Sequence, residues 1–186
     1  MSTSAKNIHH HRALSRSLLT RDQVEVIRDL VSTQKLSRAG VIGNNKSLAR
    51  TCRQIWLRED HRTNWLYQII KDLIDEAADN FGFEIGHIEM AQYLDYHPFE
   101  YYLKHVDNGD DNVAHRKLTA SIQLSSPREY IGGNFKIDTL PDVTVANKNL
   151  GSVIVFPSFL QHSAGPVWIG SRKALVVWAR GTNTLH

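Results

Sequence analysis

Apolar residues recur at helical spacing in "TRDQVEVIRDLVS", residues 20–32. Positions three and four apart share one face of a helix, so the pattern predicts an amphipathic helix. Thr20 and Gln23 have the spacing of a capping box, in which each side chain accepts a hydrogen bond from the other residue's backbone amide. We therefore expect the helix to begin at this pair. Its apolar positions are Val24, Ile27, Leu30 and Val31.

A second amphipathic segment is "TNWLYQIIKDLIDEAADNFG", residues 63–82. Thr63 is a candidate N-cap, and Gly82 stands where a left-handed residue commonly ends a helix. The residues between the two helices, 34–50, show no periodic pattern and are expected to form a loop. The apolar face of the second helix consists of Leu66, Ile69, Ile70, Leu73, Ile74 and Ala77.

From His87 onward the pattern changes to about eight short segments rich in β-branched and aromatic residues, separated by Gly, Pro, Asn or Asp. Two helices followed by such strands predict an α+β fold in which the helices pack on the outside of an antiparallel sandwich or barrel. The clearest segments are "IEMAQYLDY", "KLTASIQL", "NFKI", "VTVA", "SVIVF" and "KALVVWAR".

The length of 186 residues predicts one domain, which we place at residues 20–186 after a polar, flexible N-terminal segment of residues 1–19. The formal net charge of +3 is too small to indicate a nucleic-acid-binding surface by itself. Cys52 is the only cysteine, which excludes an intramolecular disulfide and a four-cysteine zinc site. No apolar run is long enough for a membrane span or a secretory signal. We expect a cytoplasmic protein without a membrane partner.

The segment "KHVDNGD", residues 104–110, places His105 and Asp107 two residues apart. A single His-x-Asp pair is expected by chance, and on its own it describes a polar strand end. Residues i and i+2 of a strand point to one face, however, so both side chains can bind one metal ion. In "GSVIVFPSFLQHSAG", residues 151–165, His162 follows an apolar strand and offers a third ligand. Two imidazoles and one carboxylate are the facial triad of non-haem Fe(II) oxygenases.

The other histidines form weaker candidates. Three are consecutive in the N-terminal segment, at positions 9–11, and are expected to be exposed. Four more are expected to have no nearby carboxylate at strand spacing and to be surface or core residues without a metal, namely His61, His87, His97 and His115.

Arg172 begins the strand-like segment "SRKALVVWARG", residues 171–181. By alternation, Arg172 shares a face with Val176 and Trp178. An arginine on the inward face of a barrel is costly without a carboxylate, and a dicarboxylate cosubstrate would supply one. The alternative is that Lys173 and its alternating partners face inward instead.

Together these segments resemble the Fe(II)- and 2-oxoglutarate-dependent dioxygenases, in particular the prolyl 4-hydroxylase-like family. The resemblance covers residues 50–181 and includes "REYIGGNF", which is similar to the strand turn before the family's long hairpin. It implies a double-stranded β-helix, or jelly-roll, core buttressed by the N-terminal helices. It rests on "YLDYHPFEYYLKHVDNG", "HRKLTASIQLSSPREYIGGNFKI" and "GSVIVFPSFLQHSAGPVWIGSRKALVVWARG" in this order.

The resemblance also implies roles for individual residues. His105, Asp107 and His162 would bind Fe(II), and Arg172 would pair with the distal carboxylate of 2-oxoglutarate. The cosubstrate pocket would further contain Tyr96, Thr119, Gln123 and Trp178, for which core packing is the alternative. Relatives carry tyrosine at the position of Gln123, which leaves its role less secure.

The implied reaction consumes 2-oxoglutarate and O₂ at Fe(II), with ascorbate as a reductant, and hydroxylates a prolyl residue of a protein or peptide. A free amino acid or another small metabolite is the alternative substrate. Nucleic acid is disfavoured, because nucleic-acid demethylases carry a second arginine where this chain has Trp178. Two other hypotheses are a non-catalytic binding module and a zinc hydrolase with the same three ligands. The loop "DNGDDNVAHR" and residues 34–50 are candidate lids.

Overall fold

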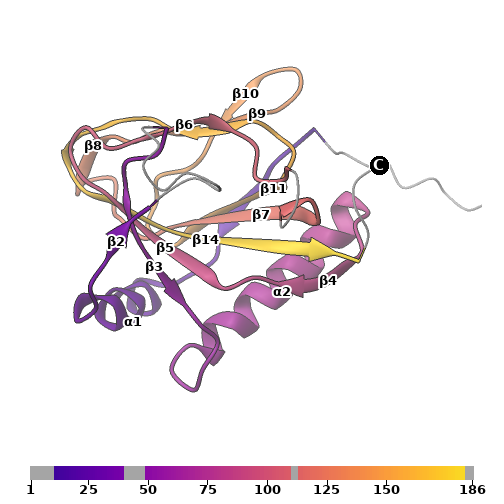
Figure 1. Ribbon diagram of the computed structural model, residues 1–186, viewed down its shortest axis with the longest axis horizontal. Coiled ribbons are helices and arrows are strands. Elements are labelled where there is room, and N and C mark those ends of the chain that lie inside the picture. Colours follow the sequence, from indigo (N-terminus) through magenta and orange to yellow (C-terminus); the bar gives the residue numbers. More distant parts are fainter. Residues whose placement is uncertain (1–10, 40–48, 110–112, 183–186) are drawn as a thin grey trace, which may run out of the picture.

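The computed structural model describes residues 11–39, 49–109 and 113–182, which contain two helices and fourteen strands (Figure 1). The helices are α1 (Arg21–Ser32) and α2 (Asn64–Phe81). The strands are β1 (Leu14–Ser17), β2 (Ser37–Arg38), β3 (Arg53–Leu57), β4 (Ile85–Ile88), β5 (Ala91–Tyr96), β6 (Tyr102–His105), β7 (Arg116–Gln123), β8 (Tyr130–Gly132), β9 (Phe135–Asp138), β10 (Val143–Val145), β11 (Ser152–Pro157), β12 (His162–Ala164), β13 (Val167–Gly170) and β14 (Arg172–Gly181).

The strands form two facing sheets and a short ribbon. In the described residues the larger sheet has eight strands in the order β1-β11-β7-β14-β5-β3-β2, with β4 also pairing with β14. The smaller sheet has the order β10-β9-β12-β6, and β13 pairs with β8. Figure 1 shows α1 and α2 on the side of the larger sheet that faces away from the smaller one. The predicted α+β jelly-roll with helices outside the sheet is confirmed.

Alternation along β14 separates two cores. Leu175 and Val177 pack with α2 and α1 in the larger hydrophobic cluster. Val176 and Trp178 belong to a second cluster, which contains residues of β5, β8 and β12. Successive strand residues point to opposite faces, so one strand supplies both the helix-facing layer and the layer between the sheets. The predicted orientation of this strand is confirmed by these contacts.

Local hydrogen bonds explain where the helices begin and end. At α1, the amide of Gln23 donates to Thr20 Oγ1 (3.3 Å) and the amide of Thr20 donates to Gln23 Oε1 (2.8 Å), as the capping box predicts. Gly82 ends α2 with φ = 69°. Thr63 is the N-cap residue of α2, as predicted. Its side chain does not cap the helix, however, because the hydroxyl donates to Arg58 O (2.5 Å) and accepts from the Asp60 amide (2.9 Å).

The N-terminal third contains more strand than its sequence pattern predicts. Leu14–Ser17 form β1 and pair with β11, although they belong to the segment expected to be polar and unpatterned. Ser37–Arg38 form β2 within the expected loop, and β3 follows at Arg53–Leu57. All four β1 residues are exposed, so this edge strand shows no apolar alternation. Residues 1–10 and 40–48 lie outside the described part of the chain.

Among the helices of the described residues, none has the length and apolar character needed to cross a membrane.

Candidate active site

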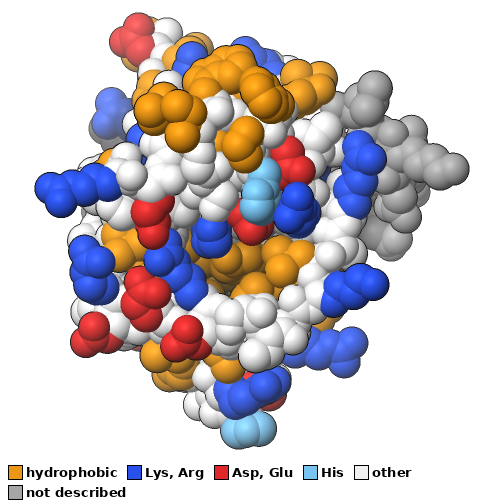
Figure 2. Space-filling model, turned by 90° about the vertical axis from the view of Figure 1, so that its left-hand side faces the viewer, with side chains coloured by type: hydrophobic (Ala, Val, Ile, Leu, Met, Phe, Trp, Pro, Cys, Tyr) orange, Lys and Arg blue, Asp and Glu red, His pale blue; other side chains and the backbone are white. Residues whose placement is uncertain are grey.

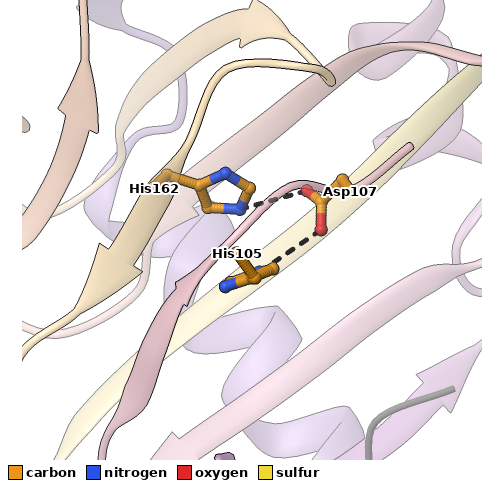
Figure 3. Close-up of side chains that lie close together, drawn as sticks. All are labelled: His105, Asp107 and His162. Carbon is orange, nitrogen blue, oxygen red and sulfur yellow. Dashed lines mark ion pairs between the residues drawn. The ribbon is translucent and has the colours of Figure 1, made fainter. Parts of the chain in front are cut away.

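His105, Asp107 and His162 come together at the end of the smaller sheet (Figure 3). His105 is the last residue of β6, and His162 is the first residue of β12. The two strands are antiparallel, and the two histidines lie opposite each other. Asp107 lies just beyond β6, where its amide donates to Ser158 O (2.9 Å). His105 Nε2 is 3.4 Å from Asp107 Oδ1, and His162 Nε2 is 3.2 Å from Asp107 Oδ2. The predicted triad therefore converges, with the carboxylate held in a bend rather than in the strand.

Each imidazole is oriented by a backbone carbonyl two residues earlier. His105 Nδ1 lies 2.8 Å from Leu103 O, and His162 Nδ1 lies 3.0 Å from Leu160 O. A carbonyl oxygen only accepts, so Nδ1 carries the hydrogen in both rings. Nε2 of each ring consequently faces Asp107, and its lone pair would bind a metal when the ring is neutral. Metal-binding histidines are commonly fixed this way, and the donor set fits a divalent metal such as Fe(II).

The Asp107 carboxylate is held by Thr119 of β7, whose hydroxyl donates to Asp107 Oδ2 (2.8 Å) and lies 3.0 Å from Ser158 Oγ. Burial of Asp107 opposes ionisation, but His162 and His105 hold the pKa of the carboxyl well below its usual value. The carboxyl group is therefore ionised at neutral pH, the form in which it can bind a metal.

The pKa values of the two histidines are shifted in opposite directions. Burial lowers the pKa of His105 below 6.5, despite its contact with Asp107. Burial acts on His162 in the same sense, but the Asp107 carboxylate outweighs it and raises the pKa of His162 above 6.5. Without a metal, His162 and Asp107 are thus the ion pair of the site.

A cavity of about 610 Å³ adjoins the triad. Its lining includes an aromatic wall formed by Trp56 and Trp178, whose ring centroids are 6.0 Å apart. Tyr102 also lines the cavity, and its ring stacks on His105 with 3.5 Å between the centroids. Figure 2 shows a face of the molecule that is hollowed, with hydrophobic side chains at the base of the hollow and charged side chains around it. The site is thus open to a ligand larger than an ion.

Arg172 is buried, with 4% of its surface exposed, and faces the layer between the sheets. Its guanidinium carbon lies 5.6 Å from the centroid of the Tyr96 ring and 5.7 Å from that of Phe135. Both rings line the large cavity, whereas Arg172 itself lines a small void of about 10 Å³. No carboxylate of the described residues forms an ion pair with it. Lys173 points elsewhere and lies 3.8 Å from Asp95.

The remaining predicted pocket residues divide into two groups. Tyr96, Thr119 and Trp178 line the large cavity. Burial raises the pKa of the Tyr96 phenol, which therefore stays protonated. Gln123 lines the small void beside Arg172, where its amide nitrogen lies 2.9 Å from the Tyr130 hydroxyl and donates to Ser125 O (3.1 Å).

Two polar groups around the cavity were not predicted from the sequence. Arg50 lines the cavity, and its guanidinium donates to Gln92 Oε1 (2.8 Å). Glu89 accepts from Arg116 and Arg180, each at 2.6 Å, and the Arg116 guanidinium lies over the Trp178 ring at 4.0 Å. These contacts join residues 27 to 91 positions apart, so no local motif marks them.

The expectation that His97 has no carboxylate at strand spacing is wrong. Its Nε2 lies 3.1 Å from Asp95 Oδ2, and the two residues form an Asp-x-His pair in the sequence. The candidate lids include residues 40–48 and 110–112, which lie outside the described part of the chain.

Comparison with known families agrees with this geometry. The model of the 2OG-Fe(II) oxygenase superfamily matches residues 91–180, which include the triad and Arg172. This match places the segment of residues 91–180 in the superfamily. A PKHD-type hydroxylase of Prochlorococcus marinus is 36% identical over 77 residues, which are 41% of this chain and 35% of that protein. The chain spans between about a third and just over half of the length of such curated relatives.

Solved structures share the fold of this chain. A Pseudomonas putida prolyl-4-hydroxylase superimposes with a TM-score of 0.77 at 16% identity, covering 93% of this chain and 94% of the other. A Trichoplax adhaerens prolyl hydroxylase in complex with a hypoxia inducible factor peptide fragment gives a TM-score of 0.79 at 16% identity, covering 92% and 84%. The prolyl 4-hydroxylase-like resemblance is confirmed at the level of fold.

Proposed function

We propose that this chain is an Fe(II)- and 2-oxoglutarate-dependent dioxygenase that hydroxylates a C–H bond of a prolyl residue in a protein or peptide. The observation that carries the proposal is the convergence of His105, Asp107 and His162, with Nε2 of both rings directed at one carboxylate. Neither a purely structural ion pair nor a surface cluster requires two histidines that are oriented in this way.

The three residues would hold the iron, which supplies O₂ activation coupled to the oxidative decarboxylation of 2-oxoglutarate when it is bound. The protein's contribution is to fix the ligands. Leu103 O and Leu160 O set the tautomer of the histidines, and Thr119 sets the carboxylate orientation. Such partners of the ligands typically change metal affinity 10- to 100-fold when they are removed.

Arg172 would bind the distal carboxylate of 2-oxoglutarate. It is a buried cation without a carboxylate partner among the described residues, and such a charge is costly unless a ligand neutralises it. The planar guanidinium can donate two parallel hydrogen bonds to a carboxylate. The protonated Tyr96 phenol beside it is available to donate a further hydrogen bond to the cosubstrate.

The substrate assignment is supported by the solved structures that share this fold, two of which are prolyl hydroxylases and one of which holds a peptide. The aromatic wall of the cavity suits the apolar ring of proline. A free amino acid is the alternative substrate, and ascorbate is the proposed reductant. A zinc hydrolase is disfavoured, because Arg172 would have no partner in that reaction.

The decisive experiment is an anaerobic titration of the metal-free protein with Fe(II) and 2-oxoglutarate, following the visible charge-transfer band of the complex. We expect a band that saturates near one equivalent per chain. Asp107→Ala should lose the band and the production of succinate from 2-oxoglutarate while keeping its circular dichroism spectrum. Asp142→Ala, which removes an exposed carboxylate far from the triad in sequence, is the matched control. A folded wild-type protein without the band would contradict the proposal and favour a binding module.

A further inference from the structure

Three cationic side chains line the large cavity, and only one of them has no carboxylate partner in the described part of the chain. Arg116 pairs with Glu89 at 2.6 Å, and Lys104 pairs with Asp138 at 2.8 Å. Arg50 forms no ion pair, although only 6% of its surface is exposed. Its guanidinium donates to Gln92 Oε1 (2.8 Å) and Cys52 Sγ (3.4 Å), neither of which carries a carboxylate charge.

The backbone around Arg50 is fixed against the strand that ends in the metal site. Arg50 forms an isolated antiparallel bridge with Tyr102. The Leu103 amide donates to Ala49 O (2.8 Å), and the Thr51 amide donates to Tyr101 O (3.1 Å). The position of the guanidinium is therefore set by the same segment that carries His105.

One aromatic ring connects Arg50 with the proposed iron site. The Arg50 guanidinium carbon lies 4.7 Å from the centroid of Tyr102, and the same ring stacks on His105 at 3.5 Å. Arg50 is thus close enough for a small ligand to contact both the guanidinium and the region in front of the metal. Arg172, by contrast, lies between the Tyr96 and Phe135 rings and does not line this cavity.

The charge of the filled site supports a second anion. Fe(II), the Asp107 carboxylate, dianionic 2-oxoglutarate and Arg172 together sum to zero. Arg50 then remains as a buried positive charge without a counter-ion, which is unfavourable in a site of low dielectric. A carboxylate bound beside it would form charge-assisted hydrogen bonds with the guanidinium fork.

We propose that Arg50 binds a carboxylate of the substrate, which Gln54 and Gln92 help to orient while the target ring packs on Trp56 and Trp178. Both glutamines line the cavity, and they hydrogen-bond to each other across β3 and β5. This inference rests on the proposed function and narrows its substrate class. The carboxylate comes either from the α-carboxyl group of an amino acid or from an acidic side chain next to the target residue in a peptide.

The test uses wild-type protein and Arg50→Gln, each loaded with Mn(II) and 2-oxoglutarate. Paramagnetic relaxation of the probe protons reports binding near the metal. One probe pair is L-proline and L-prolinamide, and the other is the capped dipeptides Ac-Pro-Asp-NH₂ and Ac-Pro-Asn-NH₂. Arg53→Gln, an exposed arginine on the following strand, is the matched control.

We expect at least one acid probe to bind wild-type protein about tenfold or more tightly than its amide. Arg50→Gln should remove that preference without changing the affinity for the amide, and Arg53→Gln should retain it. The probe pair that shows the preference identifies the source of the carboxylate. Three outcomes would overturn the inference. They are equal binding of acid and amide in both pairs, no binding of either acid, and a preference that persists in Arg50→Gln.

The anaerobic titration with Fe(II) and 2-oxoglutarate distinguishes a failure of the proposed function from a failure of the role proposed for Arg50. If the charge-transfer band is absent, the proposed function fails, whatever Arg50 binds. If the band forms in wild type and in Arg50→Gln while acid and amide probes bind equally, only the role of Arg50 is wrong. An altered requirement for 2-oxoglutarate in Arg50→Gln would assign this arginine to the cosubstrate instead of the substrate.

Discussion

The hydroxyl of Thr119 donates a hydrogen bond of 2.8 Å to Asp107 Oδ2 and thereby connects the two sheets. Thr119 lies on β7 of the larger sheet, and Asp107 follows β6 of the smaller sheet. The same carboxylate oxygen lies 3.2 Å from His162 Nε2. The orientation of the proposed anionic ligand is therefore set from outside the strand pair that carries the histidines.

Thr119→Val keeps the side-chain shape and removes this hydrogen bond. We expect the affinity for Fe(II) to fall about tenfold, the lower end of the effects seen when a partner of a metal ligand is lost. Competition with a chelating indicator under anaerobic conditions measures the affinity. Thr119→Ser keeps the hydroxyl and should bind iron nearly as the wild type does. Equal affinities for all three proteins would show that the hydroxyl does not support the ligand.

Arg172→Gln should raise the KM for 2-oxoglutarate about 10- to 100-fold, because a charge-assisted contact to the distal carboxylate contributes about 1.5–3 kcal/mol. Arg172→Lys should recover part of this loss, since it restores the charge without the planar fork. Lys173→Gln changes the neighbouring residue on the opposite face and serves as the control. Succinate formation measured against 2-oxoglutarate concentration gives the result. An unchanged KM in Arg172→Gln would mean that the cosubstrate is bound elsewhere.

Gly133 makes room for Arg172. Its φ is +59°, and an added Cβ would lie 3.1 Å from both Arg172 Cδ and Tyr130 Cε2. Gly133→Ala should therefore displace the arginine and raise the KM for 2-oxoglutarate, in addition to a strain cost of about 1–3 kcal/mol in stability. Gly165→Ala meets its nearest atom at 3.4 Å and has no positive φ, so it should change neither property much. Thermal unfolding and succinate assays of both variants make the comparison. A Gly133→Ala protein with wild-type cosubstrate affinity would contradict this role.

Metal binding should release protons in a pH-dependent way. Asp107 raises the pKa of His162 above 6.5, whereas burial lowers that of His105, and a metal binds only the neutral imidazole. Proton release per metal should therefore decline as the pH rises through the raised pKa of His162, and it should increase again at lower pH, where His105 is protonated as well. Calorimetric titration with Zn(II), used as a redox-inert probe, in buffers of different ionisation enthalpy counts the protons. A count independent of pH between about 6 and 9 would contradict the His162 assignment.

The His162–Asp107 pair also determines whether the stability of the metal-free protein rises or falls with pH. The pKa of His162 is raised on folding, so its ion pair with Asp107 stabilises the metal-free protein below pH 6.5. That contribution is lost as the pH rises through the folded-state pKa of His162. A bound metal replaces the proton and removes this dependence.

The elements with a repeating apolar pattern were predictable. α1 and α2 bury residues at helical spacing. β7, β11 and β14 are buried over all or most of their length, and their apolar residues are visible in the sequence. The strands β1 and β2 are short, exposed and stabilised by pairing with distant segments, so their own residues contain no strand pattern. β3 buries Leu57 alone, which is too little for a periodic pattern.

The site divides in a similar way. His105 and Asp107 are two residues apart, and the alternation of β14 predicts the direction of Arg172. Arg50 could not be predicted, because its place in the cavity depends on a bridge to Tyr102, 52 positions along the chain. The pairing of Glu89 with Arg116 and Arg180 likewise exists only after β4, β7 and β14 have assembled.

Successive residues of β14 face two different layers of the molecule. Arg172, Val176 and Trp178 face the proposed chemistry, while Leu175, Val177 and Ala179 pack against the helical layer. A change that repacks the helices is therefore expected to move the strand that carries Arg172, the proposed cosubstrate-binding arginine. Heat resistance and turnover are consequently not independent properties of this protein, because selection for each acts on opposite sides of the same ten residues.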